Sequence, residues 1–154
     1  MKRRIFLKRS FAAGAVGVAA ATGLLAPQQV LAAWNKAAFE AKELPGALDA
    51  LMGSSAMAES ADITVKAPDI AENGAVVPVT IDAGMDGVES IAIVASNNPV
   101  PLVAHFIMGS GATGFVSTRI KMGKTGDVIG VVKAGGKLYS AKKEVKVTIG
   151  GCGG

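Results

Sequence analysis

The stretch VVPVTIDAGMDGVESIAIVA, residues 76–95, shows the pattern that decides the fold of this chain. It contains two runs rich in β-branched residues, 76–83 and 88–95, and the glycine-containing segment AGMDG joins them. Runs of this length and composition predict strands, and a short glycine-containing connection predicts a turn between them. The stretch therefore predicts two successive strands of a β-protein.

Five further runs of the same kind flank this stretch, and turns rich in glycine or polar residues separate them. The runs are DITVKA (62–67), LVAHFIM (102–108), GFVSTRIKM (114–122), DVIGVVKA (127–134) and KLYSAKKEVKVTIG (137–150). Seven such runs predict an all-β fold, an immunoglobulin-like antiparallel β-sandwich of about seven strands. The chain has a single cysteine, so no internal disulfide forms, and the likeness to antibody domains is one of architecture only.

A short helical segment is expected before the sandwich. Residues 33–53, AWNKAAFEAKELPGALDALMG, are rich in good helix formers and place apolar residues at helical spacing. The pair Pro45-Gly46 interrupts this pattern. We therefore predict two short helical turns and not one long helix.

Residues 1–32 have the features of an export signal. A basic start, a weakly apolar run and small residues before a cleavage point after Ala32 follow one another in the order of a signal peptide. Within the start, Arg3, Arg4, Phe6 and Leu7 match the twin-arginine export motif. A membrane-spanning anchor needs about 20 strongly apolar residues in succession, and this run ends too early. The sequence therefore predicts export to the periplasm in a folded state, without a membrane anchor.

Removal of the predicted signal would change the net charge of the chain. Five of the 16 basic residues lie in the signal and all 12 acidic residues lie after it, so the remaining chain has 11 − 12, a net charge of −1. A basic protein would be expected to bind nucleic acid or anionic membranes. Neither partner is expected here, because the excess positive charge lies in the signal.

The residue inventory excludes most catalytic and metal sites. One histidine, His105, and one cysteine, Cys152, are too few for the usual zinc, copper or iron sites, so we expect no metal and no cofactor. His105 lies in an apolar strand-like run, where a half-buried structural role is expected. A catalytic pair of the two would require the tail to fold back onto that strand. The segment GSGATG, 109–114, lacks the Gly-Lys-Ser/Thr ending of a phosphate loop and is expected to be a hairpin turn.

The chain ends in the sequence TIGGCGG, 148–154, in which Cys152 stands between two pairs of glycines, Gly150-Gly151 and Gly153-Gly154. The alternating apolar residues before it predict a last strand that stops at Gly150. Residues 150–154 are therefore expected to form a flexible arm, spanning at most about 17 Å, that presents an exposed thiol. The domain itself would comprise residues 33–149.

The surroundings of this thiol favour a carrier over a catalyst. No basic residue lies within five positions of Cys152, and the terminal carboxylate lies two residues away. A nearby negative charge disfavours a thiolate. The thiol would then be activated only inside the active site of a partner enzyme.

The terminal GGCGG, together with ITVKAPDIAENGAVVPVTI (63–81), NNPVPLVAHF (97–106) and the twin-arginine signal, resembles the SoxY family of sulfur carriers. The resemblance covers essentially the whole chain after the signal. It implies an immunoglobulin-like sandwich that pairs with a SoxZ-like subunit, and a Cys152 thiol that holds thiosulfate-derived sulfur covalently. It also implies transient partners: a haem c enzyme (SoxXA), a manganese hydrolase (SoxB) and a molybdenum and haem dehydrogenase (SoxCD).

Other chemical uses of the C-terminus fit the sequence less well. Activation of the terminal glycine as a thiocarboxylate would need ATP, which an exported protein lacks. Prenylation requires a cysteine at the fourth position from the end, and residue 151 is glycine. The remaining alternative is an exported β-sandwich interaction module in which Cys152 forms an intermolecular disulfide.

Overall fold

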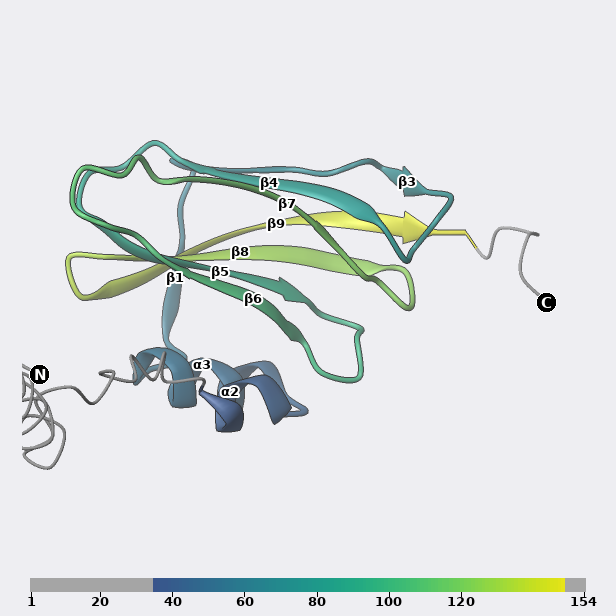
Figure 1. Ribbon diagram of the computed structural model, residues 1–154, viewed down its shortest axis with the longest axis horizontal. Helices are drawn as coiled ribbons and strands as arrows, with labels where there is room; N and C mark the ends of the chain where they lie inside the picture. Colours follow the sequence, from purple (N-terminus) through teal and green to yellow (C-terminus); the bar gives the residue numbers. More distant parts are fainter. Residues whose placement is uncertain (1–34, 149–154) are drawn as a thin grey trace, which may run out of the picture. The chain divides into compact units, whose positions relative to one another are not determined.

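A computed structural model describes residues 35–148, which form a β-sandwich with two helices against one face (Figure 1). The described residues contain nine strands: β1 (Met57–Glu59), β2 (Ile63–Lys66), β3 (Ile70–Ala71), β4 (Val77–Ala83), β5 (Val88–Ala95), β6 (Leu102–Ile107), β7 (Phe115–Ile120), β8 (Gly126–Ala134) and β9 (Lys137–Val147). The larger sheet has the order β1-β9-β8-β5-β6, and β3 also pairs with β9. The smaller sheet has the order β2-β4-β7.

This strand order is that of an immunoglobulin-like sandwich, as the sequence predicts. Strands β2, β4 and β7 stand where immunoglobulin domains have A, B and E, and β9, β8, β5 and β6 stand where they have G, F, C and C′. Each of the seven predicted runs contains one strand. The prediction of the fold class is confirmed.

Two short strands were not predicted. β1 and β3 pair in parallel with β9, so the sandwich is not purely antiparallel and has nine strands within residues 35–148 instead of seven. With three and two residues they are too short to show alternation. They are strands because they satisfy backbone groups along the outer edge of β9, one near its beginning and one near its end.

The main core lies between the two sheets. In β4, Val77, Val79 and Ile81 point inward and alternate with more exposed residues, which is the burial pattern of a half-buried strand. Gly130 of β8 allows close packing here, because a Cβ at that position would lie 2.8 Å from Ile81 Cδ1. These contacts, with buried residues of β5, β8 and β9, join the two sheets.

The outer face of the larger sheet is covered by α2 (Lys36–Glu40) and α3 (Leu44–Met52). Leu48 of α3 is fully buried in a second cluster with Ala92 and Val94 of β5 and Val131 of β8. Residues 91–95 of β5 are therefore buried on both faces, which explains why VESIAIVA is an almost continuous apolar run.

The helical segment forms two helices, as predicted, but they do not separate at Pro45-Gly46. Pro45 lies in the first turn of α3, where its missing N–H has no helical partner to lose, and the helix runs through Gly46. The break lies at residues 41–43 instead. At the start of α2, the Asn35 side chain accepts a hydrogen bond from the Ala38 N–H at 3.1 Å.

Candidate functional site

The residues that the sequence points to as functional lie at the two ends of the chain. Cys152 and the glycines Gly150, Gly151, Gly153 and Gly154 lie outside the described residues, as do Arg3, Arg4, Phe6 and Leu7 of the export motif. The structure does describe the point at which the tail leaves the domain. We call Val147 and Thr148 the arm root, because Val147 ends β9, Thr148 is the last described residue, and both stand just before the predicted arm.

The arm root is hydrogen-bonded on both sides. On one side, the Val147 N–H donates to Thr125 Oγ1 at 2.9 Å, and the Thr125 hydroxyl donates to the Val147 carbonyl at 3.4 Å. On the other side, the Thr148 N–H donates to the Ala71 carbonyl at 3.1 Å, next to the parallel pairing of β3 with β9. β9 is therefore fastened to the domain as far as Thr148.

Asparagine side chains hold the β7–β8 turn that carries Thr125. Asn97 Nδ2 donates to the Thr125 carbonyl and Asn98 Nδ2 to the Lys121 carbonyl, both at 2.7 Å. Asn98 Oδ1 accepts from the Gly123 N–H at 2.9 Å. The β5–β6 connection and the β7–β8 turn are thus joined by side-chain bonds to backbone groups. The partner of the arm root is itself fixed in place.

Gly74 closes the same end of the sandwich from the β3 side. Its carbonyl accepts a hydrogen bond from the Met122 N–H at 2.7 Å. A Cβ on Gly74 would collide with the Met122 carbonyl oxygen and lie 2.8 Å from Val147 Cγ1. Only glycine allows the backbone to approach the arm root this closely.

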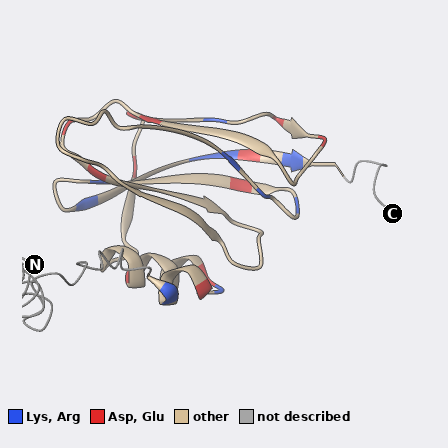
Figure 2. Cartoon of the chain, viewed as in Figure 1, with Lys and Arg blue, Asp and Glu red and all other residues tan. Residues whose placement is uncertain are grey.

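We call this end of the sandwich the root face. It consists of residues 69–76, the β5–β6 connection at 96–101, the β7–β8 turn at 121–125 and the arm root. In Figure 1 these segments lie at the right-hand end, where β9 ends. Figure 2 shows basic residues near the end of β9 and in the β7–β8 turn.

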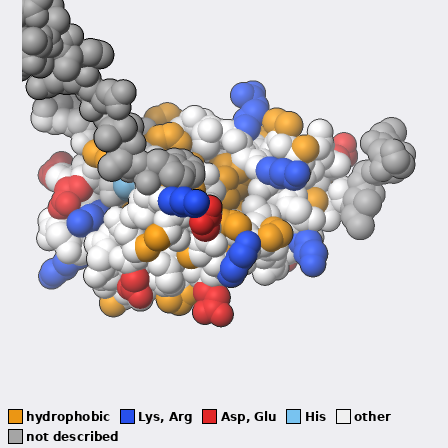
Figure 3. Space-filling model, turned by 60° about the horizontal axis from the view of Figure 1, so that its bottom comes forward, with side chains coloured by type: hydrophobic (Ala, Val, Ile, Leu, Met, Phe, Trp, Pro, Cys, Tyr) orange, Lys and Arg blue, Asp and Glu red, His pale blue; other side chains and the backbone are white. Residues whose placement is uncertain are grey.

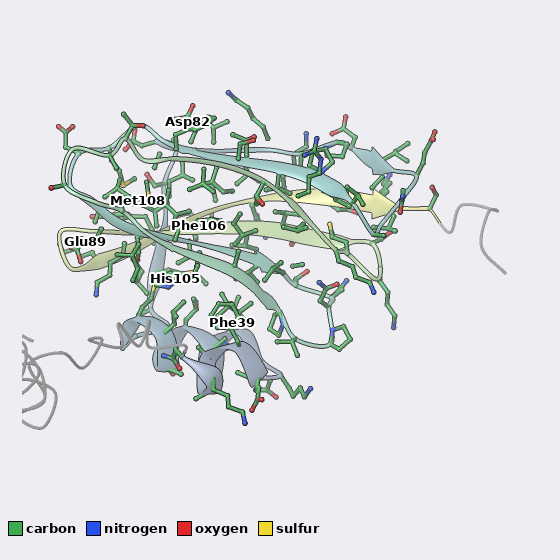
Figure 4. All side chains as sticks on the ribbon, viewed as in Figure 1. Phe39, Asp82, Glu89, His105, Phe106 and Met108 are labelled. Atoms are coloured by element: carbon green, nitrogen blue, oxygen red, sulfur yellow. The ribbon has the colours of Figure 1, made fainter. Side chains whose placement is uncertain are left out.

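His105 lies away from the root face and on the helix side of the larger sheet (Figure 4). It is partly buried, as predicted, and its Nε2 is buried with no hydrogen-bond partner in the part of the chain that the structure describes. Burial lowers the pKa of His105 below 6.5, because the charged imidazolium is poorly solvated there. The neutral form of His105 is therefore favoured in the folded domain.

Strand register places His105 beyond the reach of Cys152. His105 is level with Ala92, Val131 and Ser140 on the neighbouring strands, and Ser140 stands seven residues before Val147. Seven residues along β9 and three strand spacings across the sheet make a separation of about 27 Å. Cys152 follows Thr148 by four residues, which span at most about 14 Å. A catalytic pair of these two residues is excluded by this geometry.

Other features of the described residues offer no catalytic centre. Between residues 35 and 148 no three His, Asp or Glu side chains are grouped as a metal site would require. A shallow hollow of about 430 Å³, lined by residues of β1 and β9 that include Met57, Lys137 and Tyr139, lies at the beginning of β9, far from the arm root. Neither helix in this part of the chain has the length and hydropathy needed to cross a membrane.

Comparison with known proteins gives a match to a protein family and a match to a solved structure, and both concern SoxY. A family model described as "Sulfur oxidation protein SoxY" matches residues 48–152. The solved structure of the sulfur carrier protein SoxY from Chlorobium limicola f thiosulfatophilum is 48% identical, with a TM-score of 0.61, and the match covers 67% of this chain and 94% of that one. A search of curated protein sequences gives no significant match.

A second solved structure is similar only in outline. It is described as a putative superoxide reductase from Thermotoga maritima, is 13% identical and has a TM-score of 0.48, over 60% of this chain and 88% of that one.

Fold and matches together define a sulfur carrier protein that acts in sulfur oxidation and is not itself a catalyst. The chain belongs to the SoxY family, because the family model matches more than half of its length. The family resemblance noted in the sequence and the prediction of a carrier role are confirmed.

Proposed function

We propose that Cys152 is the attachment point for sulfur cargo and that residues 150–154 present it to partner enzymes as a flexible arm. The observation that supports this most directly is the fixed arm root. The only cysteine of the chain follows, within four residues, the point where Thr125 and Ala71 fasten β9. The match to the SoxY family also extends to residue 152.

The cargo we propose is thiosulfate-derived sulfur. In the loading step, the Cys152 thiolate and the outer sulfur of thiosulfate form an S–S bond, and two electrons leave to a SoxXA-like haem enzyme. In the next step, water attacks the sulfonate sulfur on a SoxB-like hydrolase. Sulfate and two protons are released, and a persulfide stays on Cys152. Thiolates form such adducts reversibly, which a serine hydroxyl would not do.

Activation of the thiol is assigned to the partners. The nearest basic residue in the sequence, Lys146, stands six residues before Cys152. A cysteine with an ordinary pKa of about 8.5 keeps most of its proton at neutral pH. A partner active site that supplies positive charge or a base would lower the thiol pKa only where the reaction occurs.

The wider assembly is proposed from the family context. We infer a stable heterodimer with a SoxZ-like subunit, and a SoxCD-like dehydrogenase that oxidises the remaining sulfane sulfur. We also infer export to the periplasm by the twin-arginine route, based on Arg3, Arg4, Phe6 and Leu7. This route transports folded proteins, so the pair would cross the membrane together.

Substitution of Cys152 by serine tests the attachment point. We expect Cys152→Ser to abolish thiosulfate-dependent oxygen uptake while the purified domain keeps its thermal unfolding midpoint. Intact mass spectrometry of the parent protein from thiosulfate-grown cells should show thiosulfonate, persulfide or sulfonate adducts on Cys152. The rival interaction module predicts only free thiol or an intermolecular disulfide. Full activity of Cys152→Ser would refute the carrier site.

A further inference from the structure

We propose that the root face is the docking surface for the enzymes that load and unload Cys152, and that it fits an active-site rim that is apolar and carries carboxylates opposite Lys121 and Lys124. The proposal rests on Cys152 being the attachment point. A partner enzyme would then contact the apolar side chains and the lysines at this end of the domain, and would need apolar groups and carboxylates to do so.

The length of chain beyond the arm root forces this contact. Cys152 lies four residues after Thr148, so its Cα lies within about 14 Å of the Thr148 Cα. An enzyme that encloses the thiol must therefore bring the mouth of its active site to the end of the sandwich. The opposite end is distant, because the 11 residues of β9 extend over about 33 Å. Only one end of the domain can meet such an opening.

Two exposed apolar side chains lie on the root face. Ile70 is 57% exposed and Val76 is 50% exposed, and both belong to the segment that carries β3. Ile70 is level with Lys146 of β9, beside the arm root. Large apolar residues exposed beside a functional segment are typical of a contact surface, because their burial on binding is favourable.

Basic side chains surround these apolar residues. Lys121, Lys124 and Lys146 are exposed and form no ion pair with any residue between 35 and 148. The acidic residues nearby are Glu72 and Glu144, which are exposed, Asp127, which is partly buried, and Asp69, whose carboxylate lies 3.0 Å from Lys143 Nζ. The β7–β8 turn itself carries Lys121 and Lys124 and no acidic residue, which favours carboxylates on the part of a partner that faces this turn. Figure 3 shows basic and apolar side chains interspersed over the right-hand part of the molecule.

The root face is built to hold its shape before binding. Asn98 fixes the turn that carries Lys121 and Lys124, and the pairing of β3 with β9 fixes Ile70 beside Lys146. A preorganised surface loses little conformational entropy when a partner binds. The mobile part of the interaction would then be confined to the arm.

Matched substitutions at the two ends of the domain test the proposal. Ile70→Ser and Lys124→Glu change the root face. Ile107→Ser and Lys137→Glu make the same changes at the opposite end, where Ile107 is 82% exposed and Lys137 begins β9. Each variant is mixed with the purified thiosulfate-coupling haem enzyme of the same cells, thiosulfate and an oxidised cytochrome. The rate of adduct formation on Cys152 is followed by intact mass at several carrier concentrations.

We expect each root-face variant to raise KM for the carrier about tenfold with kcat nearly unchanged, and each opposite-end variant to stay within about twofold of the parent. Alkylation of Cys152 by iodoacetamide should proceed at one rate in all five proteins, which shows that the thiol stays accessible. Equal KM values for the two sets, or a larger effect at the opposite end, would overturn the docking surface. Absence of any adduct on the parent Cys152 would instead refute the proposed function.

Discussion

The two ends of the sandwich are built by different means. At the root face, Ser96, Asn97, Asn98 and Thr125 form side-chain hydrogen bonds to backbone groups 22 to 31 residues away in sequence. At the opposite end, the β4–β5, β6–β7 and β8–β9 connections depend on glycines with positive φ: Gly87, Gly111, Gly135 and Gly136. One side chain, Glu89, adds a long-range bond by accepting from the Gly136 N–H.

This difference shows where the domain needs rigidity. A glycine turn needs only a local backbone conformation to reverse the chain. A network of side-chain bonds between distant segments also fixes those segments relative to one another. The network stands at the end from which the carrier arm is expected to leave, so the arm would start from a defined point.

The largest expected effect comes from a methyl group at the root face. Gly74→Ala places a Cβ against the Met122 carbonyl oxygen and Val147 Cγ1. We expect a loss of about 1–3 kcal/mol in the free energy of unfolding, because the backbone must shift to accept the methyl group. Urea denaturation followed by circular dichroism measures the loss. Gly109→Ala, at the opposite end, is the control, since nothing lies within 4 Å of its added Cβ. Equal stability of the two variants would show that the root face is not tightly packed.

A smaller effect is expected from one hydroxyl group. Thr125→Val removes the acceptor for the Val147 N–H while the size of the side chain is kept. We expect a loss of about 1 kcal/mol. Hydrogen exchange at the Val147 amide should accelerate strongly, while exchange at the Leu138 amide, near the other end of β9, should be unchanged. Thr125→Ser keeps the hydroxyl and should restore protection at Val147. Unchanged exchange in Thr125→Val would mean that β3 alone holds the arm root.

The smallest effect concerns His105, which belongs to neither end. Burial lowers its pKa below 6.5, so the unfolded chain binds a proton more readily than the folded domain as the pH falls through this range. The free energy of unfolding should therefore decrease from pH 7 toward the lowered pKa. His105→Phe should remove this part of the pH dependence without changing exchange at Val147. A pH profile identical to that of the parent protein would show that His105 does not titrate in this range.

Most of the fold could be predicted from local sequence. β-branched runs between turns predict the seven strands β2 and β4 to β9. Glycines predict the turns at the opposite end. β1 and β3 could not be found in this way, because a segment such as Ile70–Ala71 becomes a strand only when β9 lies beside it. The sequence pattern also predicts a break between two helices at Pro45. This prediction is wrong, because the first turn of a helix accepts proline and α3 contains Pro45 there.

The candidate site could also be predicted only in part from the sequence. Cys152 stands out in the sequence because glycines surround it and no other cysteine exists. The residues that hold the arm root do not stand out. Asn98 and Thr125 occur in ordinary polar turns, and their importance comes from a meeting of segments 22 or more residues apart. Two polar turns predicted at the same end of a sandwich offer a weak signal for such a network.

The position of β9 in the larger sheet has a consequence for the order of events in the cell. This strand pairs with β8, β1 and β3, so the larger sheet stays incomplete until residues 137–147 have left the ribosome. A truncated or stalled chain would lack both the closing strand and the thiol. The proposed attachment site, Cys152, follows β9 by only five residues, so the sheet is completed close to the time at which this cysteine is made, and a domain without β9 has no cysteine with which to bind sulfur.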